Sequence, residues 1–494
     1  MTNQTRETLV GSINPGSTRT NAPGAIAIVG GGISGLSLAF ELRRGGASVI
    51  LFEASSRVGG TIESTVQQGF ITEAGPNGFL DREPATRQLT AALGLTDRIR
   101  SADDAAKRRF IYTRGTLREV PSSPPAFLKS NILPLFARLR VAAELFSGRA
   151  EDPENETLAD FARRHLGKSA AQVLVDAMQA GIFAGNSEKL SLAATFPRMA
   201  ELERDHRSLI LAMIRLQRQR RGTGAATETA GPSGTLCSFD GGLDRLTSAL
   251  GQELGPTIRL KTDVQAIART GTGWELQVLS GGAQERIDAK QLVLAVPSYV
   301  ASKLVQPIAG LLASELEAIE YAPICVVHLG YARREASVPS GFGFLVPTQE
   351  RLSILGALFI SSIFPWRSAE QRTLLTCMVG GARRPELFSL DDGELVRAVR
   401  ADLERTLGLS DPPSFQKIVR WRRGIPQYNV GHLARLRRID EAASKLPGLA
   451  LTGNAYRGVG LNDCIRNSAA LAGKLLQNAT TAHSALQQDS ERLT

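Results

Sequence analysis

The stretch that most constrains the fold is AIAIVGGGISGLSLAFELRRGGASVILFE, residues 25–53. A short apolar run precedes glycines at positions 30, 32 and 35, a helix-like stretch follows and ends at a glycine pair, and a second apolar run ends in Glu53. This order predicts a strand–turn–helix–strand unit whose N–H groups meet a pyrophosphate while the carboxylate accepts from a ribose hydroxyl. A tight turn without a ligand is the alternative. An acidic residue here favours NAD or FAD over NADP.

The segment after Glu53 distinguishes NAD from FAD. SRVGGTIES, residues 56–64, places Arg57, a glycine pair and Thr61 just after the second strand. It resembles the second signature of the flavin-dependent amine oxidase and desaturase clan, in which this loop lies along the pyrophosphate. The resemblance implies FAD.

A second strand–glycine–helix junction lies more than 400 residues later, in GNAYRGVGLNDCIRNSAALAG, residues 453–473. One extended FAD molecule accounts for both junctions, with its adenosine at the first and its isoalloxazine at the second. Val459, Gly460 and Leu461 would then bring N–H groups and a helix N-terminus to the flavin edge where negative charge collects on reduction. Taken alone, this junction is equally typical of an ordinary capped helix.

Composition narrows the class of protein. The chain has 494 residues, 43% hydrophobic and 21% charged, which is ordinary for a globular protein of two or three domains. Four scattered cysteines and five histidines without ligand spacing argue against a disulfide framework and a metal site, and favour a reducing compartment. The net charge of +10 suits nucleic acid, anionic lipid or a polycarboxylate substrate, or serves solubility alone.

Patterning along the chain predicts a polar, disordered leader over residues 1–24 and a polar tail over 478–494. Helical patterns dominate residues 83–222. They include TLADFARRHLG, capped by Thr157 and ending at Gly167, and SAAQVLVDAMQAG, ending at Gly181. GWELQVLSGGAQERID predicts two strands around a Gly-Gly turn, and strand-like segments dominate residues 321–381.

Seven further motifs carry a family resemblance: EAGPNGFLDREPA, KRRFIYTRG, GIFAGNSEKLSLAATFP, HRSLI, FGFLVP, GIPQYNVGHL and GNAYRGVGLNDCI. Together they resemble the oxygen-dependent protoporphyrinogen oxidases, most of all the myxobacterial type, over residues 25–474. The resemblance implies an α/β fold with a Rossmann-like, two-dinucleotide-binding FAD domain at residues 25–85, 232–300 and 440–477. It also implies a helical membrane-binding insertion at 86–222 and a mixed-sheet substrate domain at 301–439.

The same resemblance implies one non-covalent FAD per chain, a homodimer, and six-electron oxidation of protoporphyrinogen IX by dioxygen. It assigns cofactor contacts to three loops and to scattered positions, namely Gly30, Gly31, Gly32, Ile33, Ser34, Gly35, Glu53, Ala54, Arg57, Gly60, Thr61, Gly75, Pro76, Asn77, Gly78, Val264, Trp421, Val459, Gly460 and Leu461. No metal is implied.

Substrate contacts also come from the resemblance. Arg109 matches the arginine that pairs with a propionate, with Arg108 as the competing register, and Gly181 matches a glycine whose carbonyl faces the tetrapyrrole. The remaining wall positions are Ile182, Leu345, Leu358 and Met378, the last standing where many relatives have phenylalanine. An apolar pocket with few cationic anchors suits a macrocycle that carries two propionates.

The flavin supplies the redox chemistry, so the protein has to orient the substrate and accept a proton. With so few histidines we expect no histidine base; Asn77, the Gly181 carbonyl or the flavin itself would serve. Asn77, Arg109 and Gly181 are therefore the candidate catalytic residues.

Three other functions remain open. Coproporphyrinogen III, with four carboxylates, would need more cations, and Arg108 and Lys107 are close by. An amine oxidase would need an aromatic cage, which an aromatic content of 5% disfavours. A non-catalytic flavin-binding module is the third.

Residues 206–221 hold five arginines, no acid and an apolar stripe, and PAFLKSNILPLFARLRVAAEL upstream is similar. A membrane-surface helix, a nucleic-acid patch and a solvated face all fit this pattern. Little aromatic interleaving disfavours nucleic acid. We therefore expect peripheral association with the cytoplasmic face of the cell membrane.

Overall fold

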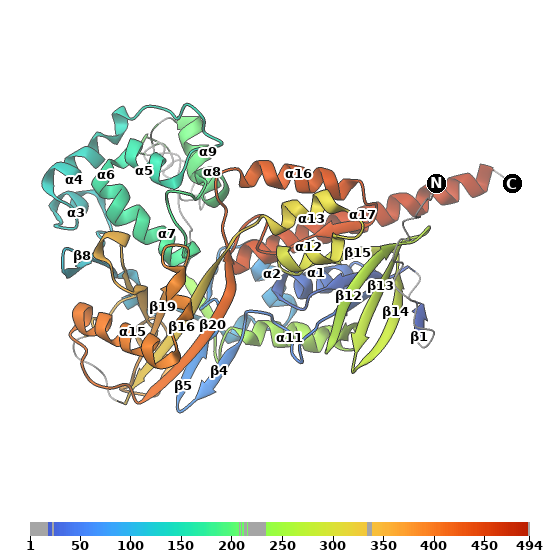
Figure 1. The fold of residues 1–494 in the computed structure, drawn as a ribbon, viewed down its shortest axis with the longest axis horizontal. Coiled ribbons are helices and arrows are strands. Elements are labelled where there is room, and N and C mark those ends of the chain that lie inside the picture. The colour runs from blue at the N-terminus through green and yellow to red at the C-terminus, as the bar shows by residue number, and fades with distance from the viewer. Residues whose placement is uncertain are drawn as a thin grey trace, which may run out of the picture.

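The computed structural model describes residues 18–21, 24–206, 208, 210, 211, 215, 234–332 and 338–492. Three regions are visible in Figure 1: a group of helices at upper left, a large sheet below it, and an α/β region on the right from which a long helix extends. Most of the basic segment 206–221 and of the glycine-rich stretch after it lies outside the described residues.

A five-stranded parallel sheet forms the centre of the α/β region. Its order is β11 (Ile258–Arg259), β3 (Val49–Phe52), β2 (Ile26–Val29), β15 (Gln291–Leu294) and β21 (Leu449–Leu451). β2 is buried on both faces, which explains its unbroken apolar sequence. The strands therefore come from three distant parts of the chain.

Helices cover one face of this sheet. Ile26 and Ile28 pack with the apolar sides of α1 (Ile33–Arg44), α11 (Asp244–Leu254) and α17 (Leu461–Arg492). Ala27 and Val29, pointing the other way, pack with a second sheet and with α12 (Ser298–Val305), α13 (Gly310–Glu317) and α16 (His432–Ser444). The parallel sheet is thus the middle layer of three.

The second sheet has the order β1 (Thr18–Asn21), β14 (Ala283–Ala289), β13 (Trp274–Ser280) and β12 (Thr262–Arg269). The hairpin of β13 and β14 around Gly281 and Gly282 confirms the predicted one. The expected disorder was wrong for residues 18–21 of the leader, which pair with β14, whereas residues 1–17, 22 and 23 lie outside the described residues. The polar tail is described as far as Arg492, and it continues helix α17.

A seven-stranded sheet forms the lower left of Figure 1. Its order is β20 (Phe415–Pro426), β16 (Tyr321–Tyr331), β19 (Thr373–Gly380), β18 (Ile354–Phe359), β17 (Gly343–Leu345), β8 (Arg109–Thr113) and β9 (Thr116–Glu119). One face packs on α15 (Asp392–Leu407). β8 and β9 lie in a range expected to be helical; they are strands because Phe110 and Tyr112 alternate into this core.

The upper helices are α3 (Pro124–Lys129), α4 (Leu135–Ala142), α5 (Leu158–Leu166), α6 (Lys168–Ala170), α7 (Asp176–Phe183), α8 (Leu192–Thr195) and α9 (Pro197–His206). Thr157 caps α5 and Gly167 ends it, as predicted. The predicted end at Gly181 was wrong. α7 continues to Phe183, and the left-handed Ala184 (φ 45°) terminates it. No helix in the described part of the chain combines the length and apolarity that a bilayer crossing needs.

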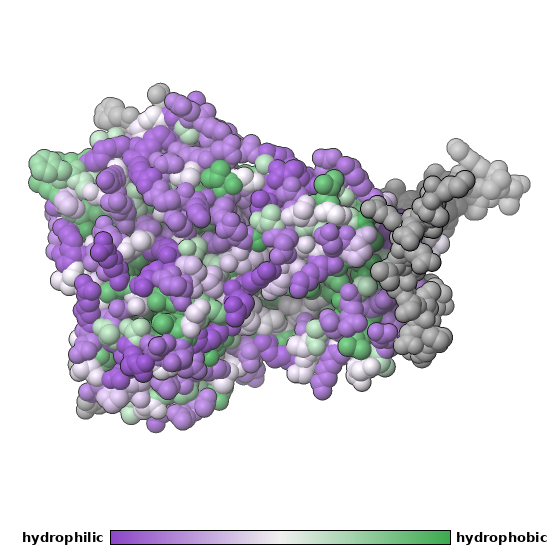
Figure 2. Space-filling model, viewed as in Figure 1, coloured by the Kyte–Doolittle hydropathy of each residue, from purple (hydrophilic) through white to green (hydrophobic). Residues whose placement is uncertain are grey.

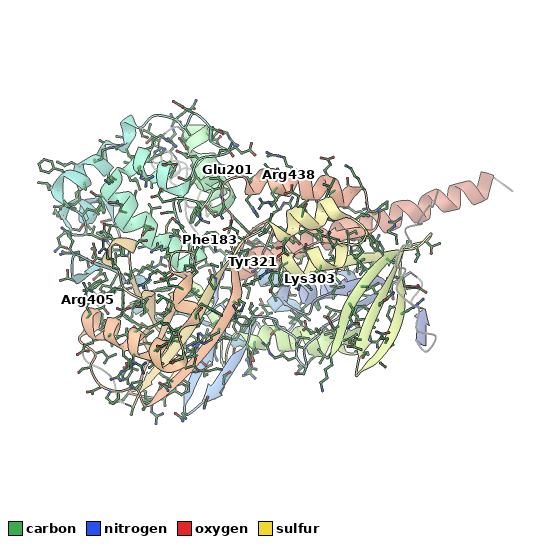
Figure 3. The ribbon with its side chains drawn as sticks, viewed as in Figure 1. Phe183, Glu201, Lys303, Tyr321, Arg405 and Arg438 are labelled. Carbon is green, nitrogen blue, oxygen red and sulfur yellow. The ribbon has the colours of Figure 1, made fainter. Side chains whose placement is uncertain are left out.

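Smaller elements connect these regions. β4 (Ser64–Gln67) and β5 (Phe70–Glu73) form a hairpin, and β6 (Phe79–Leu80), β10 (Leu236–Phe239) and β7 (Ile99–Ser101) form a three-stranded sheet. Phe183 of α7 and Tyr321 of β16 lie near the centre of Figure 3, where the three regions meet. There Gln427 Nε2 donates to the Phe183 carbonyl at 2.9 Å.

Candidate flavin and substrate site

The glycines of the first loop have different structural roles. Gly30 has φ 108°, and a Cβ atom there would lie 2.7 Å from the Ala295 carbonyl oxygen. A Cβ on Gly35 would lie 1.9 Å from the Gly30 carbonyl oxygen. At Gly32 a Cβ would meet no atom within 4 Å. Gly30 and Gly35 are thus required by close packing, whereas Gly32 faces open space.

That open space lies at the N-terminus of α1. Gly32 is the N-cap and has no side chain to accept from the helix, and the first turn, which begins with Ile33, Ser34 and Gly35, contains no acidic residue. Such a terminus favours a bound anion. The residues present therefore fit the pyrophosphate of FAD.

Glu53 follows β3 and lies beside this loop. Its Oε2 atom accepts from the Gly31 N–H at 2.7 Å, and its Oε1 atom accepts from the Ser55 N–H at 2.8 Å. Ala54, the residue between Glu53 and Ser55, is exposed. The carboxylate is held against the loop at the position where a ribose is expected. The bond to Gly31 was not foreseen, because the fingerprint assigns the carboxylate to the ligand alone.

The second loop, residues 57–61, touches the first. The Gly59 N–H donates to the Gly31 carbonyl at 2.8 Å, and a Cβ on Gly60 would lie 3.3 Å from Gly32 Cα. Arg57 donates to the Gly60 carbonyl at 2.8 Å and pairs with Glu63 at 2.8 Å. In this structure Arg57 therefore binds its own loop.

The third loop, residues 74–78, lies against the second. A Cβ on Gly75 would be 2.4 Å from the Thr61 carbonyl oxygen, and one on Gly78 would be 2.4 Å from that of Cys237. Asn77 follows Pro76, and its Oδ1 atom is buried without a partner among the described residues. All three loops thus converge, and Asn77 brings an unused acceptor to them.

Trp421 connects this third loop to the large sheet. Its Nε1 atom donates to the Ala74 carbonyl at 2.8 Å. Val264, the other isolated cofactor candidate, is buried in β12 and packs in the same core as Val29 and Phe52. The first candidate therefore lies at the converging loops, and the second behind the strands that lead to Glu53.

The C-terminal junction, Val459 to Leu461, begins α17. Gly460 donates its N–H to Asp463 Oδ2 at 3.3 Å, so an acid of the first turn occupies part of this terminus. Asp463 was visible in the sequence and was overlooked. Tyr428 braces the junction: its hydroxyl accepts from the Gly458 N–H at 2.9 Å, and its ring stacks on His432 at 4.2 Å.

One face of the seven-stranded sheet gathers the substrate candidates. Leu345 is paired with Gly356, which is paired with Met378, and Gly343 is paired with both Arg109 and Leu358. Paired residues, and residues two apart, point to the same side of a sheet. Arg109, Leu345, Leu358 and Met378 therefore share the face opposite α15.

Helix α7 covers part of this face. A Cβ on Gly181 would lie 2.9 Å from Leu345 Cδ2. Met378 and Trp421 pack with Ala180 and Ala184, at the same end of the helix. Ile182 is 40% exposed. The structure thus brings Gly181, Leu345 and Met378 together, with Leu358 one row further along.

The three cations around residue 108 have different partners. Arg108 Nη2 lies 2.9 Å from Glu119 Oε2, and Lys107 Nζ lies 2.6 Å from Asp104 Oδ1. Arg109 has no carboxylate partner within the described residues, and its guanidinium lies over the Phe342 ring at 5.1 Å. Of the three, Arg109 is the cation left for an anionic ligand.

His328, which sequence reasoning did not single out, lies on the same sheet face. It is fully buried, and its Nδ1 atom is 2.9 Å from Thr376 Oγ1. Burial lowers the pKa of His328 to about 3. The ring is therefore neutral at physiological pH.

Glycine loops that converge at one end of a parallel sheet are typical of a flavin-dependent oxidoreductase, and here Trp421 connects them to the apolar face of the seven-stranded sheet. The chain belongs to the flavin-containing amine oxidoreductase family, whose profile matches residues 33–475, and within it to the protoporphyrinogen oxidases. The bovine protoporphyrinogen oxidase is 33% identical over 485 residues, covering 91% of this chain and 98% of the relative.

Two further comparisons agree. The coproporphyrinogen III oxidase of Bacillus subtilis is 28% identical over 457 residues, covering 89% of this chain and 95% of the relative. A crystal structure of a protein from an Exiguobacterium species superposes with a TM-score of 0.78 at 28% identity, covering 92% of this chain and 99% of that one. The resemblance to the family and the α/β fold class inferred from the sequence are thereby confirmed.

Proposed function

We propose that this protein oxidises protoporphyrinogen IX to protoporphyrin IX, using one non-covalently bound FAD per chain. FAD would supply the hydride acceptor. The substrate loses six electrons in three two-electron steps, and each step reduces one dioxygen to hydrogen peroxide. The homodimer implied by the family resemblance is proposed on that ground alone.

The pattern of cation pairing carries this choice of substrate. Arg108 and Lys107 are neutralised by Glu119 and Asp104, which leaves Arg109 beside the apolar sheet face. One free guanidinium suits the propionates on one edge of a macrocycle better than four separate carboxylates. Coproporphyrinogen III is the second candidate, because a coproporphyrinogen III oxidase is among the relatives.

The proposed roles of the remaining residues follow from their positions. Leu345, Leu358 and Met378 hold the pyrrole rings against the sheet face, and Gly181 lies against Leu345 at the edge of that wall, where there is no space for a side chain. The buried Asn77 Oδ1 atom and the Gly181 carbonyl are the acceptors for pyrrole N–H protons.

We also propose that helices α3 and α4 dock on the inner face of the cell membrane. The exposed apolar residues of these helices and of the turn that follows α4 are Leu128, Leu135, Phe136, Leu139 and Leu145, and Phe136 is 84% exposed. Figure 2 shows this apolar patch at the upper left edge of the molecule. Lys129 and Arg140 are exposed beside it. Exposed aromatic and leucine side chains next to cations are typical of an interfacial helix.

An anaerobic half-reaction tests the substrate. The FAD-loaded protein is mixed with protoporphyrinogen IX or with coproporphyrinogen III, and loss of oxidised-flavin absorbance is followed. Bleaching by protoporphyrinogen in preference is the expected result. Preference for coproporphyrinogen would select the second candidate, and no bleaching with either would refute both.

A further inference from the structure

A fully buried ion pair lies beside the third loop. Arg367 Nη2 is 2.7 Å from Glu73 Oε1, and the two side chains are 0% and 1% exposed. Glu73 is the last residue of β5, directly before loop 74–78, and Arg367 ends the short turn η7 (Pro365–Arg367). A buried ion pair adds little net stability compared with apolar residues of similar size. Its presence here calls for another reason.

The pair binds the loop at two points. Glu73 directly precedes the loop in the chain and so fixes its first residue. Arg367 Nη2 donates to the Asn77 carbonyl at 2.9 Å and to Ser238 Oγ at 2.6 Å. Glu73 is itself fixed, because Oε2 accepts from Ser64 Oγ at 2.7 Å and Oε1 from the Leu243 N–H at 2.9 Å. The backbone between residues 73 and 77 is thus held at both ends.

Unused donors and an unused acceptor occur in the same place. Within the described residues, the Nε and Nη1 atoms of Arg367 are buried and have no hydrogen-bond partner, and neither has Asn77 Oδ1. Unpaired buried polar atoms are costly, and they are tolerated where a ligand or ordered water completes them. The arrangement is therefore that of a support for a binding loop.

We propose that Arg367, together with Glu73, is a positioning residue that fixes the Asn77 backbone so that the free Asn77 amide oxygen faces the flavin and its substrate. The inference rests on the proposed function, which places loop 74–78 beside the flavin. Arginine suits this task because its fork offers several donors at fixed angles, and Glu73 neutralises its charge.

Four variants of the full-length, FAD-reconstituted protein separate positioning from stability. Arg367→Met leaves a buried carboxylate unpaired and removes the donor to Asn77, so both the melting temperature of the apoprotein and FAD affinity fall. Glu73→Gln/Arg367→Met removes both charges, so the melting temperature recovers. The dissociation constant for FAD stays raised about tenfold, the size of one hydrogen bond from a charged donor. The visible flavin spectrum of this double variant also remains different from that of the unmodified protein.

Glu73→Gln alone keeps the donor to Asn77, and it loses stability but retains FAD affinity. Arg164→Met is the matched control, because Arg164 also pairs with carboxylates, Glu156 and Glu203, but in the upper helices. It lowers the melting temperature and leaves the flavin spectrum unchanged.

Recovery of both stability and FAD binding in the double variant would overturn the proposal, as would an unchanged flavin spectrum in Arg367→Met. None of these readouts uses a porphyrinogen. Failure of the proposed reaction would appear only in the half-reaction, so the two failures are distinguishable.

Discussion

Arg108 and Glu119 face each other across the β8–β9 hairpin, with 2.9 Å between Nη2 and Oε2. The neighbouring Arg109 has no carboxylate partner in the part of the chain that the structure describes. Arg109→Ala should raise KM for protoporphyrinogen about tenfold or more, whereas Arg108→Ala should change it about twofold at most. Steady-state kinetics with both variants would check this. Equal effects of the two substitutions on KM would show that Arg109 is not the residue that pairs with the propionate in preference to Arg108.

Alanine substitutions at Gly32 and at Gly35 should change different properties, FAD affinity in the first case and stability of the apoprotein in the second. Gly32→Ala meets no protein atom, so the apoprotein should keep its stability while FAD affinity falls about a hundredfold, because the methyl group occupies the pyrophosphate's place. Gly35→Ala drives a Cβ to 1.9 Å from the Gly30 carbonyl oxygen and should destabilise the apoprotein by about 3 kcal/mol. FAD titration and thermal unfolding measure the two effects. A Gly32→Ala variant that binds FAD normally would contradict this placement.

Gly181 and Leu345 form a contact that can be tested by compensation. Gly181→Ala places a methyl group 2.9 Å from Leu345 Cδ2, so Leu345 shifts and the pocket narrows. We expect KM to rise several-fold with FAD affinity unchanged. Leu345→Ala in the same chain should restore KM to within about twofold, because the clash is removed. Additive losses in the double variant would exclude a shared pocket wall.

His165 gives the upper helices a pH dependence. It is buried between Glu144, 2.7 Å from Nδ1, and Glu203, 3.3 Å from Nε2, and Ser147 and Arg164 also contact the ring. Burial alone would lower the pKa of His165, but the hydrogen bonds to the two carboxylates outweigh it and the pKa is raised. A raised pKa stabilises the fold below the unfolded value and ceases to do so as pH rises past the folded value.

The melting temperature should therefore fall as pH is raised from the usual histidine pKa through the raised pKa of His165, and His165→Gln should flatten that fall. Thermal unfolding at several pH values compares the two slopes. Parallel slopes would show that His165 does not bind an extra proton in the folded protein.

Phe136 tests the membrane face. Phe136→Ser should weaken binding to vesicles that contain anionic lipid about tenfold, because a large side chain no longer enters the interface. Leu311→Ser is the matched control, since Leu311 is 81% exposed but lies on α13. Vesicle co-sedimentation at low salt measures both. Equal loss of vesicle binding in the two variants would exclude α4 as the element that docks on the membrane.

Periodicity and glycine spacing predicted the β2–α1–β3 unit and the β13–β14 hairpin, because local contacts determine both. The membership of β8 and β9 in the large sheet was not predictable, since β8 pairs with β17, more than 200 residues away, and β9 joins the sheet only through β8. Gly181 was read as a helix end, and only its contact with Leu345 shows why glycine occurs there. Likewise, the partners of Arg108 and Arg367 are pairings that no local pattern reveals.

The position of β15 between β2 and β21 has a consequence for biosynthesis. β2 is made early, whereas β21 begins only at Leu449, so the nascent chain cannot complete its central sheet until most of it has left the ribosome. Such long-range pairing slows folding and prolongs the exposure of apolar strands. Because FAD would bind only the completed sheet, it would stabilise the folded state. A high FAD concentration during translation would then raise the yield of intact protein.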